Sequence, residues 1–134
     1  MLIFMIQLFN KISRIMVKLL SIQMAILHLQ GFVTHVPGTA PITITQMGTY
    51  LITYEVFVSG GPYAFALFNG DNQISGSNYG DTTGNATKNG QVITTLNELD
   101  VLSLRNIFAG PKNLGNAVLG ISVISASIVI LKLS

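Results

Sequence analysis

Residues 42–58 read ITITQMGTYLITYEVFV, and this stretch decides the fold class. Apolar and polar side chains alternate along its second half, which puts one apolar series on a single face: Tyr50, Ile52, Tyr54, Val56 and Val58. Alternation with a period of two is typical of a half-buried β-strand. The many Thr, Ile and Val residues also favour a strand over a helix. We therefore predict a long strand with a buried tyrosine face.

The pattern continues toward the C-terminus. A strand over Tyr63–Phe68 runs into Asn69-Gly70, a pair suited to the positive φ angles of a tight hairpin, and another strand is expected over 72–78. Residues 79–90 are polar and are expected to form a loop, whereas four later stretches fit strands: 91–96, 101–106, 117–123 and 126–133. Short strands with a turn signal about every 8–12 residues predict an all-β, antiparallel sandwich. No helical crossover is visible, which excludes a parallel α/β sheet.

The first 30 residues differ in composition from the remainder. All 13 Gly and all four Pro lie between Gly31 and Gly120. Residues 1–30 carry three basic residues and no acid, a charge of +3, whereas 31–134 carry four basic and five acidic residues, a charge of −1. This break places a boundary at Gln30–Gly31 and divides the chain into an apolar, basic leader and a nearly neutral β domain.

The leader admits more than one interpretation. On a helix, steps of four and three residues place one polar stripe on a single side: Gln7, Lys11, Arg14, Lys18 and Ser21. A basic amphipathic helix over residues 1–21 would suit a membrane surface. We favour instead a helix or strand that packs on the β domain, and residues 22–29 fit a first β-strand equally well. Three cations interrupt every window long enough for a transmembrane span.

The composition predicts self-association. Apolar residues make up 49 % of the chain and charged residues 9 %, against about 25 % charged residues in a typical soluble protein. The last strand is apolar on both faces around Ile128–Leu131, so its second face needs a cover, supplied by the leader or by another subunit.

The sequence offers little for catalysis. It contains no Cys and only two His, at 28 and 35, which we interpret as sheet-surface or interface residues. It has no G-x-S-x-G elbow, phosphate-binding loop or dinucleotide fingerprint. The five acidic residues are scattered, so turn capping is a better role for Asp71 and Asp81 than a shared calcium ion. We expect a non-enzyme with no catalytic residue, no cofactor, no metal and no nucleic-acid partner.

Several segments, in order, carry a family resemblance over residues 30–134: FVTHVPGT (32–39), ITITQMGTYLITYEV (42–56), FALFNG (65–70), GQVIT (90–94), DVLSLRN (100–106) and ASIVILKLS (126–134). Together they resemble the C-terminal domain of the collagen-like glycoproteins on bacillus spore surfaces. That family resembles in turn the jelly rolls of the tumour-necrosis-factor and complement globular-head superfamily, whose G-x-Y strand corresponds to Gly48-Thr-Tyr50. The chain itself contains no Gly-X-Y tract.

The resemblance implies a ten-stranded jelly-roll sandwich over 31–134 that forms a homotrimer around an apolar and aromatic axis. It implies a structural trimerisation module at the spore surface, or exosporium, with other exosporium proteins or glycans as further partners. Six residues are candidates for trimer or core packing: Tyr50, Tyr54, Phe65, Phe68, Val129 and Leu131. The first alternative is a glycan- or receptor-binding module that uses the polar loop 78–89. The second is a peripheral membrane protein attached through residues 1–21.

Overall fold

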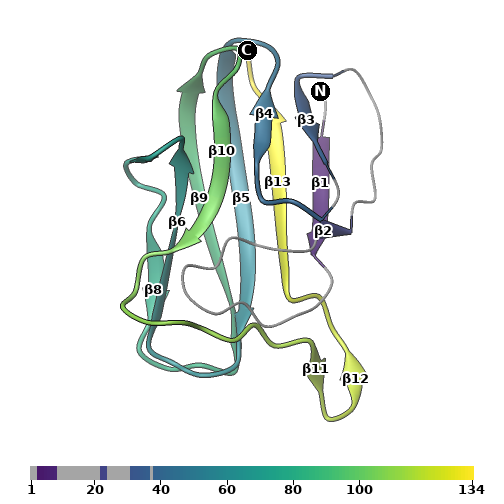
Figure 1. The fold of residues 1–134 in the computed structure, drawn as a ribbon, viewed down its shortest axis with the longest axis vertical. Helices are drawn as coiled ribbons and strands as arrows, with labels where there is room; N and C mark the ends of the chain where they lie inside the picture. Colours follow the sequence, from purple (N-terminus) through teal and green to yellow (C-terminus); the bar gives the residue numbers. More distant parts are fainter. Residues whose placement is uncertain (1–2, 9–21, 24–30, 37) are drawn as a thin grey trace.

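The structure is a computed structural model that describes residues 3–8, 22–23, 31–36 and 38–134. Two antiparallel β-sheets face each other across one core (Figure 1). The predicted all-β sandwich is therefore confirmed. The described ranges contain strands and turns but no helix, and so no helix able to cross a bilayer.

The first sheet has the strand order β2-β1-β13-β5-β9. Its longest ladder joins β5 (Gly48–Val58) to β9 (Ala86–Leu96), and β13 (Ala126–Lys132) pairs with the other side of β5. Two strands come from the leader, β1 (Ile3–Leu8) and β2 (Ile22–Gln23). The chain thus places its last strand between its first strand and β5.

The second sheet has the order β3-β4-β10-β6-β7, with β8 also paired to β6. Its members are β3 (Val33–His35), β4 (Ile42–Ile44), β10 (Val101–Asn106), β6 (Tyr63–Asn69), β7 (Asn72–Gln73) and β8 (Tyr79–Asp81). A separate hairpin, formed by β11 (Ala117–Val118) and β12 (Ile121–Ser122), projects beyond the end of the sandwich (Figure 1).

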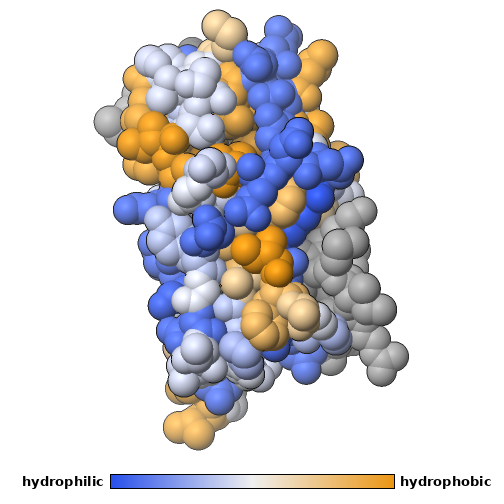
Figure 2. Space-filling view, turned by 90° about the vertical axis from the view of Figure 1, so that its left-hand side faces the viewer, coloured by the Kyte–Doolittle hydropathy of each residue, from blue (hydrophilic) through white to orange (hydrophobic). Residues whose placement is uncertain are grey.

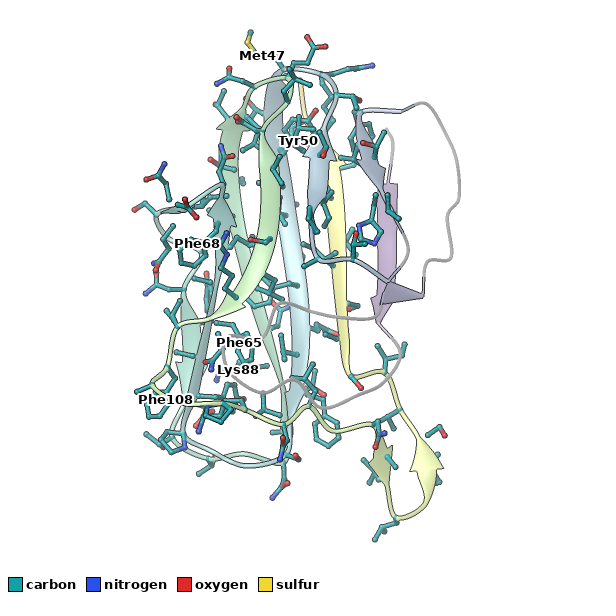
Figure 3. The ribbon with its side chains drawn as sticks, viewed as in Figure 1. Met47, Tyr50, Phe65, Phe68, Lys88 and Phe108 are labelled. Carbon is teal, nitrogen blue, oxygen red and sulfur yellow. The ribbon has the colours of Figure 1, made fainter. Side chains whose placement is uncertain are left out.

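The core lies between the two sheets. Alternate residues of β5 point into it, as the period-two pattern predicts, and they meet the inward residues of β6 and β10. The largest fully buried side chains are Tyr50, Tyr54, Tyr63, Phe65, Ile44, Ile52, Leu67, Leu96, Leu102 and Ile130. Figure 3 labels the side chains of Tyr50 and Phe65, which belong to this core.

One predicted strand and one predicted loop differ from the structure in their boundaries. The predicted strand 72–78 ends after Gln73, because Ser77 folds back toward β6: its hydroxyl donates to the Ile74 carbonyl, and the Leu67 amide donates to the Ser77 Oγ. The predicted loop 79–90 contains β8 and the first five residues of β9. These polar residues form strands through backbone pairing: β8 pairs with β6, and the start of β9 pairs with β5.

The predicted strand 117–123 is instead the β11–β12 hairpin. Its turn residues Leu119 and Gly120 have φ angles of 48° and 83°, the two positive values that a type I′ turn requires. Chain reversal at this point divides the predicted strand into two strands of two residues each. The sequence signal was weak because Leu is an uncommon residue at a positive φ angle.

The leader contributes a strand to the first sheet. β1 pairs with β13 over six residues, from Ile3 opposite Leu131 to Leu8 opposite Ala126. These residues extend the sheet beside β13, and so they do not lie over its outward face. The predicted helical stripe lies mostly outside the described residues, as do most of residues 22–29, of which Ile22–Gln23 form β2.

Candidate self-association face

The outward face of the first sheet carries an aligned apolar row. In the strand registers, Leu131 of β13 lies opposite Leu51 of β5, and Leu51 lies opposite Ile93 of β9. Directly paired residues of antiparallel strands project from the same face with their side chains about 5 Å apart. Leu51 and Leu131 are half-buried by their neighbours, whereas Ile93 is 62 % exposed. The row therefore forms a continuous strip of branched aliphatic side chains on the protein surface.

The next rows along the strands become more polar. Val129 lies opposite Thr53, which in turn lies opposite Gln91. One step further, Ser127 lies opposite Glu55 and Asn89 follows on β9. The face is therefore divided into an apolar end near Leu51 and a polar end near Glu55.

On another side of the molecule, the apolar residues are distributed differently. The side that bears β6, β8 and β9 shows apolar groups as separate patches between hydrophilic residues (Figure 2). Scattered apolar residues are ordinary on protein surfaces, whereas a contiguous apolar strip marks a contact surface. Among the surfaces of the described residues, we therefore take the row Leu51–Ile93–Leu131 as the centre of a candidate self-association face.

Three predicted site residues lie inside the sandwich. Tyr50, Tyr54 and Phe65 are at most 1 % exposed. Tyr50 donates a hydrogen bond of 2.6 Å to the Gln46 carbonyl, which joins the start of β5 to the loop before it. The Tyr54 hydroxyl lies 2.8 Å from the Ser77 carbonyl oxygen. Burial raises the pKa of both phenols, so both stay protonated donors.

The other three predicted site residues lie on outward faces of two different sheets. Val129 and Leu131 belong to the face just described. Phe68 lies on β6, where the Arg105 guanidinium stacks 4.6 Å from the centre of its ring. The structure thus brings Val129 and Leu131 together on β13 and places Phe68 in the other sheet.

Sequence reasoning missed Leu51 and Ile93. Both break the alternation: Leu51 is apolar at a position whose neighbours Thr49 and Thr53 are polar, and Ile93 follows Val92 directly. An apolar residue in the polar phase of a strand is the available signal for a second buried face. The pairing of Leu51 with Ile93, however, depends on the β5–β9 register, which cannot be read from the local sequence.

The acidic residues of the polar loops form ion pairs. Asp81 accepts a 3.0 Å hydrogen bond from the Lys88 ammonium and one of 3.2 Å from the Thr83 amide, and together they lower the pKa of Asp81 to about 2. Asp71 lies 3.7 Å from the Arg105 guanidinium. Across the described ranges, no three His, Asp or Glu side chains gather as metal ligands.

Of the two histidines, the structure describes His35. His35 on β3 approaches the Pro41 carbonyl oxygen with its Nδ1, at 2.9 Å. His28 lies outside the described residues.

The sequence matches no protein-family model and no curated protein sequence. Among solved structures, murine APRIL at pH 5.0 is similar with a TM-score of 0.69 and 12 % identity, over 98 % of both chains. The globular domain of zebrafish complement 1qA protein gives 0.64 and 16 %, over 98 % of this chain and 97 % of that one. Bushbaby GITRL gives 0.61 and 19 %, over 98 % and 92 %. At these identities the likeness concerns the fold: the chain has the jelly-roll fold of tumour-necrosis-factor-family ligands and complement globular heads.

Proposed function

We propose that this chain is a non-enzymatic structural module that assembles into a homotrimer through the apolar end of the outward face of β13, β5 and β9. The aligned row Leu51, Ile93 and Leu131 carries the proposal, because three large aliphatic side chains in register on an outward face favour contact with another subunit. Burying each of them contributes about 1.5–3 kcal/mol when complete. The jelly-roll fold supports the threefold arrangement that the family resemblance implies.

We further propose, on the sequence resemblance alone, that the module belongs to a spore-surface collagen-like protein and is located at the exosporium. Other exosporium proteins are then its expected neighbours. Contact between residues 1–21 and a membrane is a competing proposal for the leader, and co-sedimentation of the full chain with anionic liposomes tests it.

The test of assembly is the solution mass of the full chain by light scattering, for the wild type and two variants. Ile93→Lys places a charge in the apolar row at a position exposed enough to leave the isolated fold intact. Ile121→Lys is the matched control, since Ile121 is 70 % exposed on the projecting hairpin, away from that row. We expect trimers for the wild type and Ile121→Lys and a smaller species for Ile93→Lys. A monomeric wild type, or a trimer that tolerates Ile93→Lys, would reject this face.

A further inference from the structure

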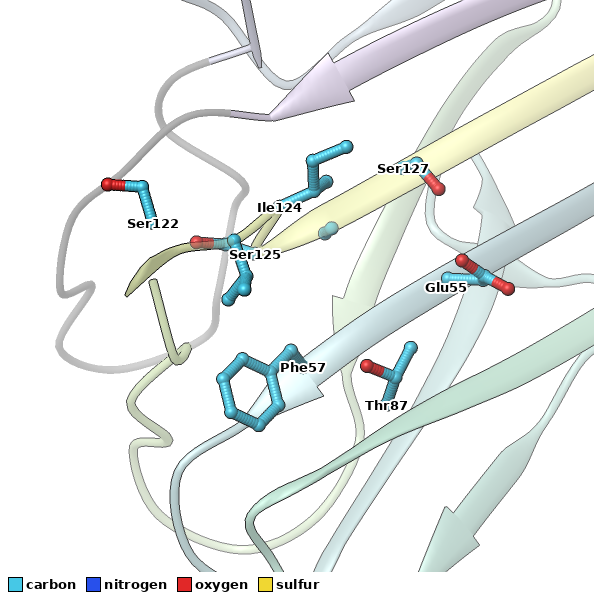
Figure 4. A pocket seen from close by; sticks show the side chains of 9 residues that line it. Glu55, Phe57, Thr87, Ser122, Ile124, Ser125 and Ser127 are labelled. Carbon is cyan, nitrogen blue, oxygen red and sulfur yellow. The ribbon is translucent and has the colours of Figure 1, made fainter. Parts of the chain in front are cut away.

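A hollow of about 430 Å³ opens at the polar end of the same face (Figure 4). β5 contributes Glu55 and Phe57 to its lining, β9 contributes Thr87, and residues 122–127 contribute the opposite wall. Its volume falls within the range of about 300–1,000 Å³ that is usual for small-molecule sites. The strand registers set its floor, because Ser127 lies opposite Glu55 and Phe57 lies opposite Thr87.

The polar groups of this hollow are uncommitted. Within the described residues, the carboxylate of Glu55 makes no hydrogen bond or ion pair, and neither do the hydroxyls of four lining residues: Thr87, Ser122, Ser125 and Ser127. Polar groups in a folded protein usually find partners in the chain, or else serve solvent and ligands. Four hydroxyls and one carboxylate that share a single concave surface are an arrangement suited to a ligand with many hydrogen-bonding groups.

Phe57 supplies an aromatic surface beside these groups. The backbone holds its ring in place: the Gly115 amide donates a 2.8 Å hydrogen bond to the Phe57 carbonyl, and Gly115 packs against the ring so closely that a Cβ there would lie 2.2 Å from Cε1. Figure 4 shows the ring next to Thr87 and Ser125. The negatively polarised face of a phenyl ring attracts groups with a positive edge, including the C–H groups of a saturated ring.

We propose that this hollow binds a neutral, polyhydroxylated ligand such as a sugar ring. Ser and Thr hydroxyls both donate and accept hydrogen bonds, whereas an ionised carboxylate only accepts, so Glu55 selects a ligand that donates. Adjacent sugar hydroxyls meet both demands, and Phe57 faces the apolar side of the ring. An anionic ligand is disfavoured, because Glu55 repels it and none of the described lining residues is cationic. The proposal does not depend on self-association.

The probes are methyl glycosides of glucose, galactose and mannose, together with methyl glucuronide, which differs from the glucoside by a carboxylate. Titrations of the full chain, followed by NMR or calorimetry at neutral pH, give the dissociation constants. We expect saturable binding of at least one neutral glycoside and about tenfold weaker binding of the glucuronide. Glu55→Gln removes the charge and retains the shape, so it is expected to weaken the neutral glycoside about tenfold and to abolish discrimination against the glucuronide.

Three further variants separate the possible outcomes. Phe57→Leu removes the ring and is expected to lose binding, whereas Glu98→Gln, at an exposed carboxylate in the β9–β10 turn, is expected to retain it. Ile93→Lys is expected to bind like the wild type whatever its oligomeric state, so a failed trimer and an empty hollow are distinguished. Unfolding temperatures report whether each variant is folded. The proposal is overturned if no neutral glycoside binds, if binding survives both Glu55→Gln and Phe57→Leu, or if methylammonium binds more tightly than every glycoside.

Discussion

Tyr54 and Gly90 lie opposite each other in the β5–β9 ladder, and the Tyr54 ring fills the space that a side chain at residue 90 would need. A Cβ built on Gly90 would lie 2.3 Å from the Tyr54 Cζ. The ring is held there because its hydroxyl is fixed between the Ser77 and Phe65 carbonyl oxygens, at 2.8 and 3.0 Å. The absence of a side chain at residue 90 is thus a packing requirement of the core.

Gly90→Ala is therefore expected to destabilise the fold by about 1–3 kcal/mol through overpacking. Chemical denaturation measures the effect. Gly31→Ala is the matched control, because nothing lies within 4 Å of a Cβ at Gly31. Equal stabilities of the two variants would show that the Tyr54 ring moves aside at little cost.

Tyr54→Phe is expected to lower the free energy of unfolding by about 1–3 kcal/mol, since it leaves buried carbonyl oxygens without their donor. Tyr79→Phe removes a hydroxyl that donates an exposed hydrogen bond of 3.1 Å to the Gln91 carbonyl oxygen. Water replaces that donor, so the loss is expected to be smaller. Comparison of the two denaturation curves tests the role of burial, and a larger loss at Tyr79 would contradict it.

The Asp81–Lys88 pair is expected to make stability depend on pH in the acid range. The folded-state pKa of Asp81 is about 2, below the ordinary value of 3.8, chiefly because Lys88 donates to its carboxylate. A lowered pKa stabilises the folded state above pH 3.8, and this contribution disappears as the pH falls toward 2. Asp81→Asn should therefore be less stable than the wild type at neutral pH and should approach it near pH 2.

Denaturation midpoints of both proteins across that range measure this convergence. In a Lys88→Met background the effect of Asp81→Asn at neutral pH is expected to shrink, because the principal donor is gone. A constant difference between Asp81→Asn and the wild type at every pH would argue against the ion pair.

Leu119→Asn is expected to stabilise the β11–β12 hairpin. Leu119 has a φ angle of 48° and is 99 % exposed, so it bears the strain of the left-handed region without any packing in return. Asn adopts that region more readily, and the gain is expected to be up to about 1 kcal/mol. Thermal unfolding measures it. Leu119→Ala shortens the side chain but does not relieve the backbone, so an equal gain in that variant would attribute the effect to lost apolar exposure.

The sequence predicted the strands whose side chains alternate. β5 follows the pattern because one of its faces meets the core, where Tyr50 and Tyr54 lie. The strands β6, β10 and β13 were predicted from short apolar stretches bounded by turn signals. The first half of β9 was missed because backbone pairing with β5, rather than apolar side chains, makes it a strand. The periodicity of side chains along a segment indicates which of its faces is buried. It does not indicate which distant strand the backbone of that segment pairs with.

The candidate sites were predictable only in part. Val129 and Leu131 were identified from the two-sided apolar character of the last strand. Their partners Leu51 and Ile93 required the register of three strands that are distant in sequence. The hollow at Glu55 was missed for the same reason, because β5, β9 and the segment before β13 meet there only in the folded molecule.

The place of β13 between β1 and β5 determines when the sheet can be completed. Among the described strands, β1 comes first in the sequence and β13 last, yet β1 pairs with both β13 and the short β2. During translation, β1 and β5 therefore lack their common neighbour until β13 has been synthesised. A chain that stops before Ala126 would leave two open strand edges facing a gap, and such edges recruit other chains. Completion of the first sheet thus depends on β13.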